Sequence, residues 1–154
     1  MTQPFLYSVE RQYDSSIDEL WSAWTDPAAL AVWYSPTQLS VLPGSVENES
    51  VVGGIWAAAI DVPMNEMVAY FYGVYTEVVE HERLVHTMCY TESSEDFMNR
   101  VDAPHHDVVV DFETRGNKSW VKFSQFGQLP EGQAPQAQAG MESYFDNLGL
   151  YLAK

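Results

Sequence analysis

The chain of 154 residues is 46% hydrophobic and 14% aromatic, which predicts one folded domain over residues 1–154 and excludes a disordered chain. Its 22 Asp and Glu against 7 Lys and Arg give a net charge of -15, and such a surface repels phosphate groups, so we expect no nucleic-acid partner. No apolar run approaches the ~20 residues that cross a bilayer, the start has no secretory-signal pattern and Cys89 is the single cysteine, so we predict a cytoplasmic protein without membrane insertion.

The first predicted elements are a strand and two short helices. Residues 5–13, FLYSVERQY, alternate and carry aromatic and β-branched side chains, as strands do. Ser15 or Ser16 can cap the first helix, whose acidic first turn suits the helix dipole. Pro27 ends that helix and opens a second short one, because proline suits a first helical turn, and Pro36 ends the second.

The middle of the chain is rich in strand and turn signals. The strand candidates, in order, are QLSVLPGSV, GGIWAAAIDVP, VAYFYGVYTEVVE, RLVHTMCYTE, HHDVVVDFET and NKSWVKFSQF. The last two are joined by Arg115, Gly116 and Asn117, which is a strong hairpin signal. We therefore predict a meander of antiparallel strands, with one face toward the core and one toward water.

The chain closes with a helix that has one broad apolar face. Its stripe at helical spacing consists of Met141, Tyr144, Phe145, Leu148 and Leu152. That face is the natural cover for the inner side of the sheet. The predicted fold class is thus α+β: a curved antiparallel sheet of about six or seven strands around a long C-terminal helix, with two short helices after the first strand.

Several motifs together resemble a known superfamily. They are DELWSAWTDPAALAVWYSP, VVGGIWAAA, GVYTEVVEHERLVHT, DVVVDFE with SWVKFSQFG, and the terminal GMESYFDNLGLYLAK, and they span nearly the whole chain. The chain resembles the helix-grip fold of the START and birch-pollen-allergen superfamily (SRPBCC), in the branch named after the activator of the ninety-kilodalton heat-shock protein ATPase. This resemblance implies a cavity between the long helix and the sheet, used elsewhere for lipids, polyketides or other apolar molecules. The chain departs from relatives at two places. It has VPMNEMV where relatives often have a turn rich in Asp and Gly, and it has Met141 where a tryptophan is common.

A pocket can also be argued from side-chain size. Ala57, Ala58 and Ala59 leave room opposite bulky aromatic residues, and ligand sites are typically apolar with a few placed polar groups. By strand alternation Gln125 points inward, as one polar group on an apolar face. Alternatively, these side chains simply fill the core and Gln125 bonds to backbone or water. The predicted ligand-binding residues are Trp33, Trp56, Tyr72, His86, Phe112, Gln125, Met141, Tyr144 and Phe145.

Two residues are candidates for acid–base chemistry. His86 shares a strand face with Leu84 and Met88, and in a cavity it could bond a ligand or move a proton. Glu77, if buried against Tyr75, would have a raised pKa and could act as acid or base. The alternatives are a satisfied core histidine and a structural or exposed carboxylate.

Other reactive groups give weak signals. His105 and His106 are adjacent in a predicted strand and point to opposite faces, so we expect no metal site. Cys89 has no basic neighbour in the sequence and is interpreted as an inert buried thiol. The chain contains no P-loop, dinucleotide fingerprint or nucleophile elbow, so we expect no cofactor.

Three functions follow from these observations. The first is a small-molecule binding protein for an apolar or lipid-like ligand. The second is a cyclase- or hydrolase-like enzyme, in which Glu77 or His86 acts with Gln125 as a polar orienter. The third, suggested by the family name, is a chaperone-interaction module acting through the acidic surface. The ligand is not specified by the sequence, and a monomer and a homodimer both stay open.

Overall fold

A computed structural model describes residues 3–154. Strand β1 (Phe5–Tyr13) is followed by the helices α1 (Ile17–Thr25) and α2 (Pro27–Trp33). The strands β2 (Ser40–Val41), β3 (Glu47–Asn48), β4 (Ile55–Val62), β5 (Met67–Val79) and β6 (Arg83–Thr91) come next, with a 3-10 turn at Pro63–Asn65 between β4 and β5. Helix α3 (Ser94–Met98), the hairpin of β7 (His106–Arg115) and β8 (Lys118–Phe126), and the long helix α4 (Ala134–Leu152) complete the chain.

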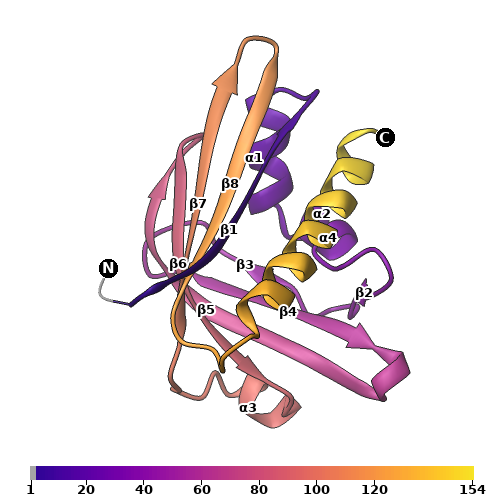
Figure 1. Cartoon of the computed structure of the whole chain (residues 1–154), viewed down its shortest axis with the longest axis vertical. Coiled ribbons are helices and arrows are strands. Elements are labelled where there is room, and N and C mark those ends of the chain that lie inside the picture. Colours follow the sequence, from indigo (N-terminus) through magenta and orange to yellow (C-terminus); the bar gives the residue numbers. More distant parts are fainter. Residues whose placement is uncertain (1–2) are drawn as a thin grey trace.

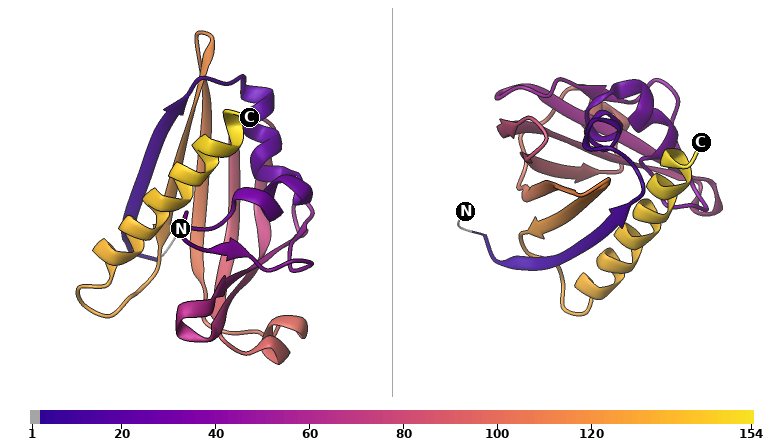
Figure 2. Two further views of the ribbon diagram at one scale, coloured as in Figure 1. Left: turned by 90° about the vertical axis from the view of Figure 1, so that its right-hand side faces the viewer. Right: turned by 90° about the horizontal axis from the view of Figure 1, so that it is seen from above.

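The strands form one antiparallel sheet of eight strands in the order β1-β8-β7-β6-β5-β4-β2, with β3 also paired to β4 (Figure 1). The sheet curls, and α4 crosses its concave side next to β1, while α1 and α2 cover the other part of that side (Figure 2). The predicted α+β helix-grip architecture is therefore confirmed. Two of the eight strands are only two residues long.

The helix ends follow the local sequence. Ser16 caps α1, because its side chain accepts from the Glu19 backbone N–H and Glu19 reaches back to the Ser16 backbone, a reciprocal capping box. Asp26 caps α2 by accepting from the Ala28 N–H, and Pro27 occupies the first helical turn. The caps stop one helix and start the next within two residues, so α1 and α2 turn sharply over the sheet.

Trp24 lies at the centre of the core between the sheet and the helices. Its ring packs edge-on against Trp33 at 4.9 Å and against Phe145 at 6.1 Å, between ring centroids, and it stacks with Phe123. The Asn147 side chain of α4 donates to the Trp33 carbonyl at 2.9 Å. Aromatic side chains thus fill the middle of the hollow, and one polar side chain fixes α4 to the end of α2.

A register shift in β5 changes which side chains face the concave side beyond Tyr75. Phe71 and Tyr75 point to the concave side, whereas Tyr72 packs on the outer side against Phe97 of α3. A bulge between Tyr75 and Glu77 then changes the alternation, and Glu77 is placed opposite Val85. Because aromatic residues occupy both odd and even positions of β5, the sequence does not show which of its side chains face the core.

In the described residues, 3–154, no helix is long and apolar enough to cross a membrane.

Candidate ligand-binding pocket

A pocket of about 500 Å³ lies at one end of the hollow, under the N-terminal half of α4. Helix α4 and the loop before it form one wall, and the inner faces of β1 and β5–β8 form the floor. Its lining residues are Tyr7, Tyr34, Phe71, Met88, Tyr90, Pro104, His106, Gln125, Leu129, Gln133, Ala137, Gly140, Met141 and Tyr144. Small-molecule sites typically have ~300–1,000 Å³, so the volume suits a small organic ligand.

The walls are mostly apolar. None of the described residues that line the pocket is Asp, Glu, Lys or Arg. The pocket stays open at Gly140 because the helix has no side chain there: a Cβ at this position would meet no atom within 4 Å. The site thus offers apolar contact area and neutral polar groups, which disfavours a charged ligand.

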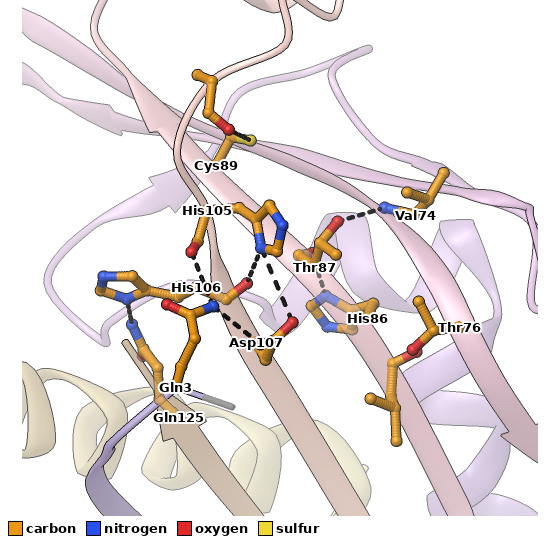
Figure 3. A network of polar contacts seen from close by, with 12 residues as sticks. Gln3, Val74, Thr76, His86, Thr87, Cys89, His105, His106, Asp107 and Gln125 are labelled. Carbon is orange, nitrogen blue, oxygen red and sulfur yellow. Dashed lines mark hydrogen bonds and ion pairs between the residues drawn. The ribbon is translucent and has the colours of Figure 1, made fainter. Parts of the chain in front are cut away.

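A directed chain of hydrogen bonds runs along the polar side of the pocket. The Tyr7 hydroxyl donates to Gln125 Oε1 at 2.6 Å. Gln125 Nε2 in turn lies 2.6 Å from His106 Nδ1 (Figure 3). An amide nitrogen can only donate, so Nδ1 accepts and the His106 proton is on Nε2. That N–H then donates to the Gln128 carbonyl at 3.1 Å. Every member has a partner, so the chain fixes both the amide and the imidazole.

Gly127 makes the position of His106 feasible. Its φ of +155 is one that side chains rarely adopt, and a Cβ there would lie 2.3 Å from His106 Cδ2. A glycine is therefore needed for the imidazole to reach Gln125 and the backbone of the loop after β8.

Three tyrosines meet at the inner end of the pocket. The Tyr34 and Tyr144 rings pack edge-on with centroids 5.1 Å apart, and Tyr7 stacks with Phe123. Burial raises the pKa of Tyr7, Tyr34 and Tyr144 above the ordinary value, and the neighbouring phenol groups raise the pKa of Tyr34 further. All three therefore stay protonated and neutral over the physiological pH range.

His86 lies on the concave face, as predicted, but it is sealed in the core. It is 4% exposed, its ring stacks on Trp56 with centroids 4.4 Å apart, and its Nδ1 lies 2.8 Å from the Thr87 carbonyl, to which it can donate. Burial lowers the pKa of His86 to about 4, against a smaller opposing effect of the Thr87 bond. The residue is a neutral core histidine and does not line the pocket.

Glu77 is not buried against Tyr75, and of the two alternatives it is the exposed carboxylate. The β5 bulge turns its side chain to the outer face, where it is 51% exposed and lies 3.8 Å from Arg83 Nε. Glu77, His86 and Gln125 accordingly lie in three separate environments: the outer surface, the sealed core and the pocket wall. The structure does not bring together the acid–base set that the sequence suggested.

The predicted ligand-binding residues are divided by the structure. Gln125, Met141 and Tyr144 line the pocket. Tyr72 lies on the outer face beneath α3, where its hydroxyl donates to the Val101 carbonyl. The remaining predicted residues pack in the core: Trp33, Trp56, His86, Phe112 and Phe145.

The pocket is also displaced from the expected place. Ala58 faces the core, while Ala57 belongs to the outer cluster with Tyr72 and Cys89. Trp56 packs in the same core cluster as Ala58. The pocket lies instead near the loop between β8 and α4, which contributes Leu129 and Gln133 to its lining. Tyr7 could have been found by alternation, since it shares a face of the first strand with Val9, and both are buried. The loop residues carried no such signal.

The described part of the chain has no group of three His, Cys, Asp or Glu side chains that could hold a metal ion. His105 lies outside the pocket, with its Nδ1 3.8 Å from Asp107, whereas His106 points to Gln125 (Figure 3). Cys89 is buried, and burial raises the pKa of its thiol, which disfavours the reactive thiolate.

Comparison with known proteins agrees with this architecture. A family model described as Activator of Hsp90 ATPase homolog 1-like protein matches residues 14–153.

Protein CV1439 from Chromobacterium violaceum is 17% identical over 96% of both chains, with a TM-score of 0.80. The AHSA1 protein SPO3351 from Silicibacter pomeroyi is 17% identical over 96% of both chains, with a TM-score of 0.79. A Staphylococcus epidermidis protein solved by NMR is 20% identical, over 99% of this chain and 94% of its own, with a TM-score of 0.77. At such identities the likeness concerns the fold. No curated protein matches the chain in sequence.

Proposed function

Because the chain belongs to the Activator of Hsp90 ATPase homolog 1-like protein family, we propose that it binds a neutral, apolar small molecule in the pocket between α4 and the sheet. The superfamily commonly binds hydrophobic ligands. The observation that carries the proposal is the pocket of about 500 Å³, open to solvent at one end and lined by apolar and aromatic side chains.

The energetics favour such a ligand. Removing apolar surface from water contributes about 25 cal/mol per Å², so an apolar molecule gains from contact with Phe71, Met88, Leu129 and Met141. The polar groups of the pocket wall are already oriented by the Tyr7–Gln125–His106 chain, so little order is lost on binding. An anionic lipid headgroup would find no cationic partner among the described lining residues.

The test combines a ligand screen with a variant that fills the pocket. A panel of neutral apolar compounds is screened by thermal shift and native mass spectrometry on the purified chain. A ligand at a hundred times its Kd stabilises the folded state by about 2.7 kcal/mol, or roughly 5 to 10 °C in Tm. Gly140→Phe, which places a ring in the open space of the pocket, should abolish the shift. Leu150→Phe, on the exposed side of the same helix, is the matched control and should keep it.

Two outcomes contradict the proposal. One is a panel in which no compound binds the chain. The other is binding that Gly140→Phe leaves unchanged, which would place the ligand elsewhere. The enzyme alternative has no support in the positions of Glu77 and His86, and the chaperone-interaction role stays a prediction from the resemblance.

A further inference from the structure

Among the described residues, the hydroxyl groups of Tyr34 and Tyr144 make no hydrogen bond to the protein. Tyr34 ends α2 and is 3% exposed, Tyr144 stands in the middle of α4, and both line the pocket. The Tyr7 hydroxyl donates to Gln125, but neither of the other two has a hydrogen-bond partner among residues 3–154. In the same part of the chain, the side-chain polar atoms that are fully buried and unpartnered are Trp24 Nε1, Arg83 Nε and Arg100 Nε. The Tyr34 and Tyr144 hydroxyls therefore keep surface that faces the pocket.

A tyrosine hydroxyl at a buried site usually has a partner, because removing it from water without one is costly. Here two such residues, with ring centroids 5.1 Å apart, line the same cavity. Both are neutral phenols that retain their proton, so each can donate one hydrogen bond to a bound molecule.

The charge of the site selects the acceptor. A carboxylate would need a cationic partner, and the described lining residues include neither Lys nor Arg, in a chain of net charge -15. A carbonyl oxygen is neutral and has two lone pairs, so it can accept from two hydroxyls at once. The surrounding tyrosine rings, with the sulfurs of Met88 and Met141, favour a planar aromatic skeleton around that carbonyl.

We propose, building on the function proposed above, that the pocket binds neutral aromatic ketones whose carbonyl oxygen accepts hydrogen bonds from the Tyr34 and Tyr144 hydroxyls. The two tyrosines are then the residues that set specificity, and the apolar wall supplies most of the affinity. The Tyr7–Gln125–His106 chain is internally satisfied and acts as a rigid side of the cavity.

A matched pair of probes isolates the carbonyl. Fluorenone and fluorene share a planar three-ring skeleton and differ at one position, where fluorenone has the carbonyl. Each is titrated into the purified chain by equilibrium dialysis. Two hydrogen bonds should make fluorenone bind about tenfold more tightly than fluorene. Tyr34→Phe and Tyr144→Phe should each weaken fluorenone binding several-fold and leave fluorene binding unchanged, and the double variant should remove the preference.

A second readout reports the hydrogen bonds directly. The carbonyl stretching frequency of bound fluorenone should be lower than that of fluorenone in an apolar solvent, and it should return toward that value in the double variant. Tyr151→Phe, on α4 but away from the pocket, is the control and should change neither readout. Unchanged Tm values for the variants show that the fold is intact, as expected for hydroxyls without a protein partner.

The outcomes separate this inference from the proposed function. Equal affinity for the two probes, or a preference that survives in the double variant, overturns the ketone inference. If fluorene binding is then lost in Gly140→Phe, the apolar pocket still stands. If neither probe binds, the ketone inference fails, while the proposed function is decided separately by the ligand panel and Gly140→Phe.

Discussion

Tyr7 lies opposite Gln125 in the register of β1 and β8, and its hydroxyl donates a 2.6 Å hydrogen bond to Gln125 Oε1. Because the other end of the amide is held by His106, one side chain satisfies two groups from different strands. Gln125 is itself buried, so its removal leaves both partners without a replacement.

Gln125→Met should therefore lower the free energy of unfolding by about 1 to 3 kcal/mol, since the buried Tyr7 hydroxyl and His106 Nδ1 lose their partner. Urea unfolding at pH 7.5 measures this change. Gln128→Met is the control, because that side chain is exposed and only its backbone carbonyl is used. Equal stabilities of the two variants would contradict the role given to the hydrogen-bond chain.

His86 should make the fold sensitive to mild acid. Its pKa is about 4 in the folded chain and 6.5 ordinarily, so below pH 6.5 the unfolded chain binds a proton that the folded chain does not. Stability is thus fully present above pH 6.5 and is lost as the pH falls toward 4. At pH 5 the loss relative to pH 7.5 should be about 2 kcal/mol.

His86→Phe keeps a ring against Trp56 and removes the titration. The difference in unfolding free energy between this variant and the parent chain should change by that amount between pH 7.5 and pH 5, while other groups cancel. His105→Gln, at an exposed site, is the control. A difference that does not vary with pH would show that His86 is protonated equally in both states.

Arg11 should fasten α4 to β1 by electrostatic contact. Its guanidinium Nη2 lies 2.7 Å from Glu142 and its Nη1 lies 2.6 Å from Asp146, which are one turn apart on the helix. Arg11→Met should lower the unfolding free energy by about 1 kcal/mol at low salt and by less in 1 M NaCl, because the pairs are partly exposed and screened. Arg115→Met, which removes an exposed pair with Glu113 within the β7–β8 hairpin, should have little effect at either salt concentration.

Replacing each of the two glycines of α4 by alanine should change the unfolding free energy by different amounts. Gly140 has open space where a Cβ would be, so Gly140→Ala should raise the unfolding free energy by about 0.5 to 1 kcal/mol through helix propensity. At Gly149 a Cβ would lie 3.3 Å from Tyr13 Cε1, and the Tyr13 hydroxyl donates to the Phe145 carbonyl. Gly149→Ala should gain less or lose stability. Thermal unfolding compares them, and an equal gain for both would contradict the close packing of α4 on β1.

Local sequence patterns gave the order of most elements. Alternation placed Val108, Val110 and Phe112 on the concave face and Gln125 among them, as the structure shows. The apolar stripe of α4 placed Phe145 and Leu148 against the core. These predictions succeed because a strand or helix that covers one face must repeat its apolar residues at its own period.

Alternation along one strand does not predict which side of the sheet a side chain faces beyond a β-bulge. The register shift between Tyr75 and Glu77 depends on how β5 pairs with β6, so the sequence left the face of Glu77 open, and the structure places it outside. Tyr72 was misplaced for a related reason, because both parities of β5 carry aromatic rings and α3 covers its outer face. Pairing between strands, rather than local pattern, decides these orientations.

By itself the sequence determined the α+β architecture, the inward face of most strands and the apolar side of the last helix, since these depend on periodicity along one segment. Only the tertiary structure decided where space remains: Trp24, Trp33 and Trp56 fill the middle of the hollow, and the pocket opens beside Gly140, between Tyr34 and Gln125. The volume of a cavity is the difference between the space that the backbone encloses and the side chains that enter it, and residues far apart in the chain contribute to both.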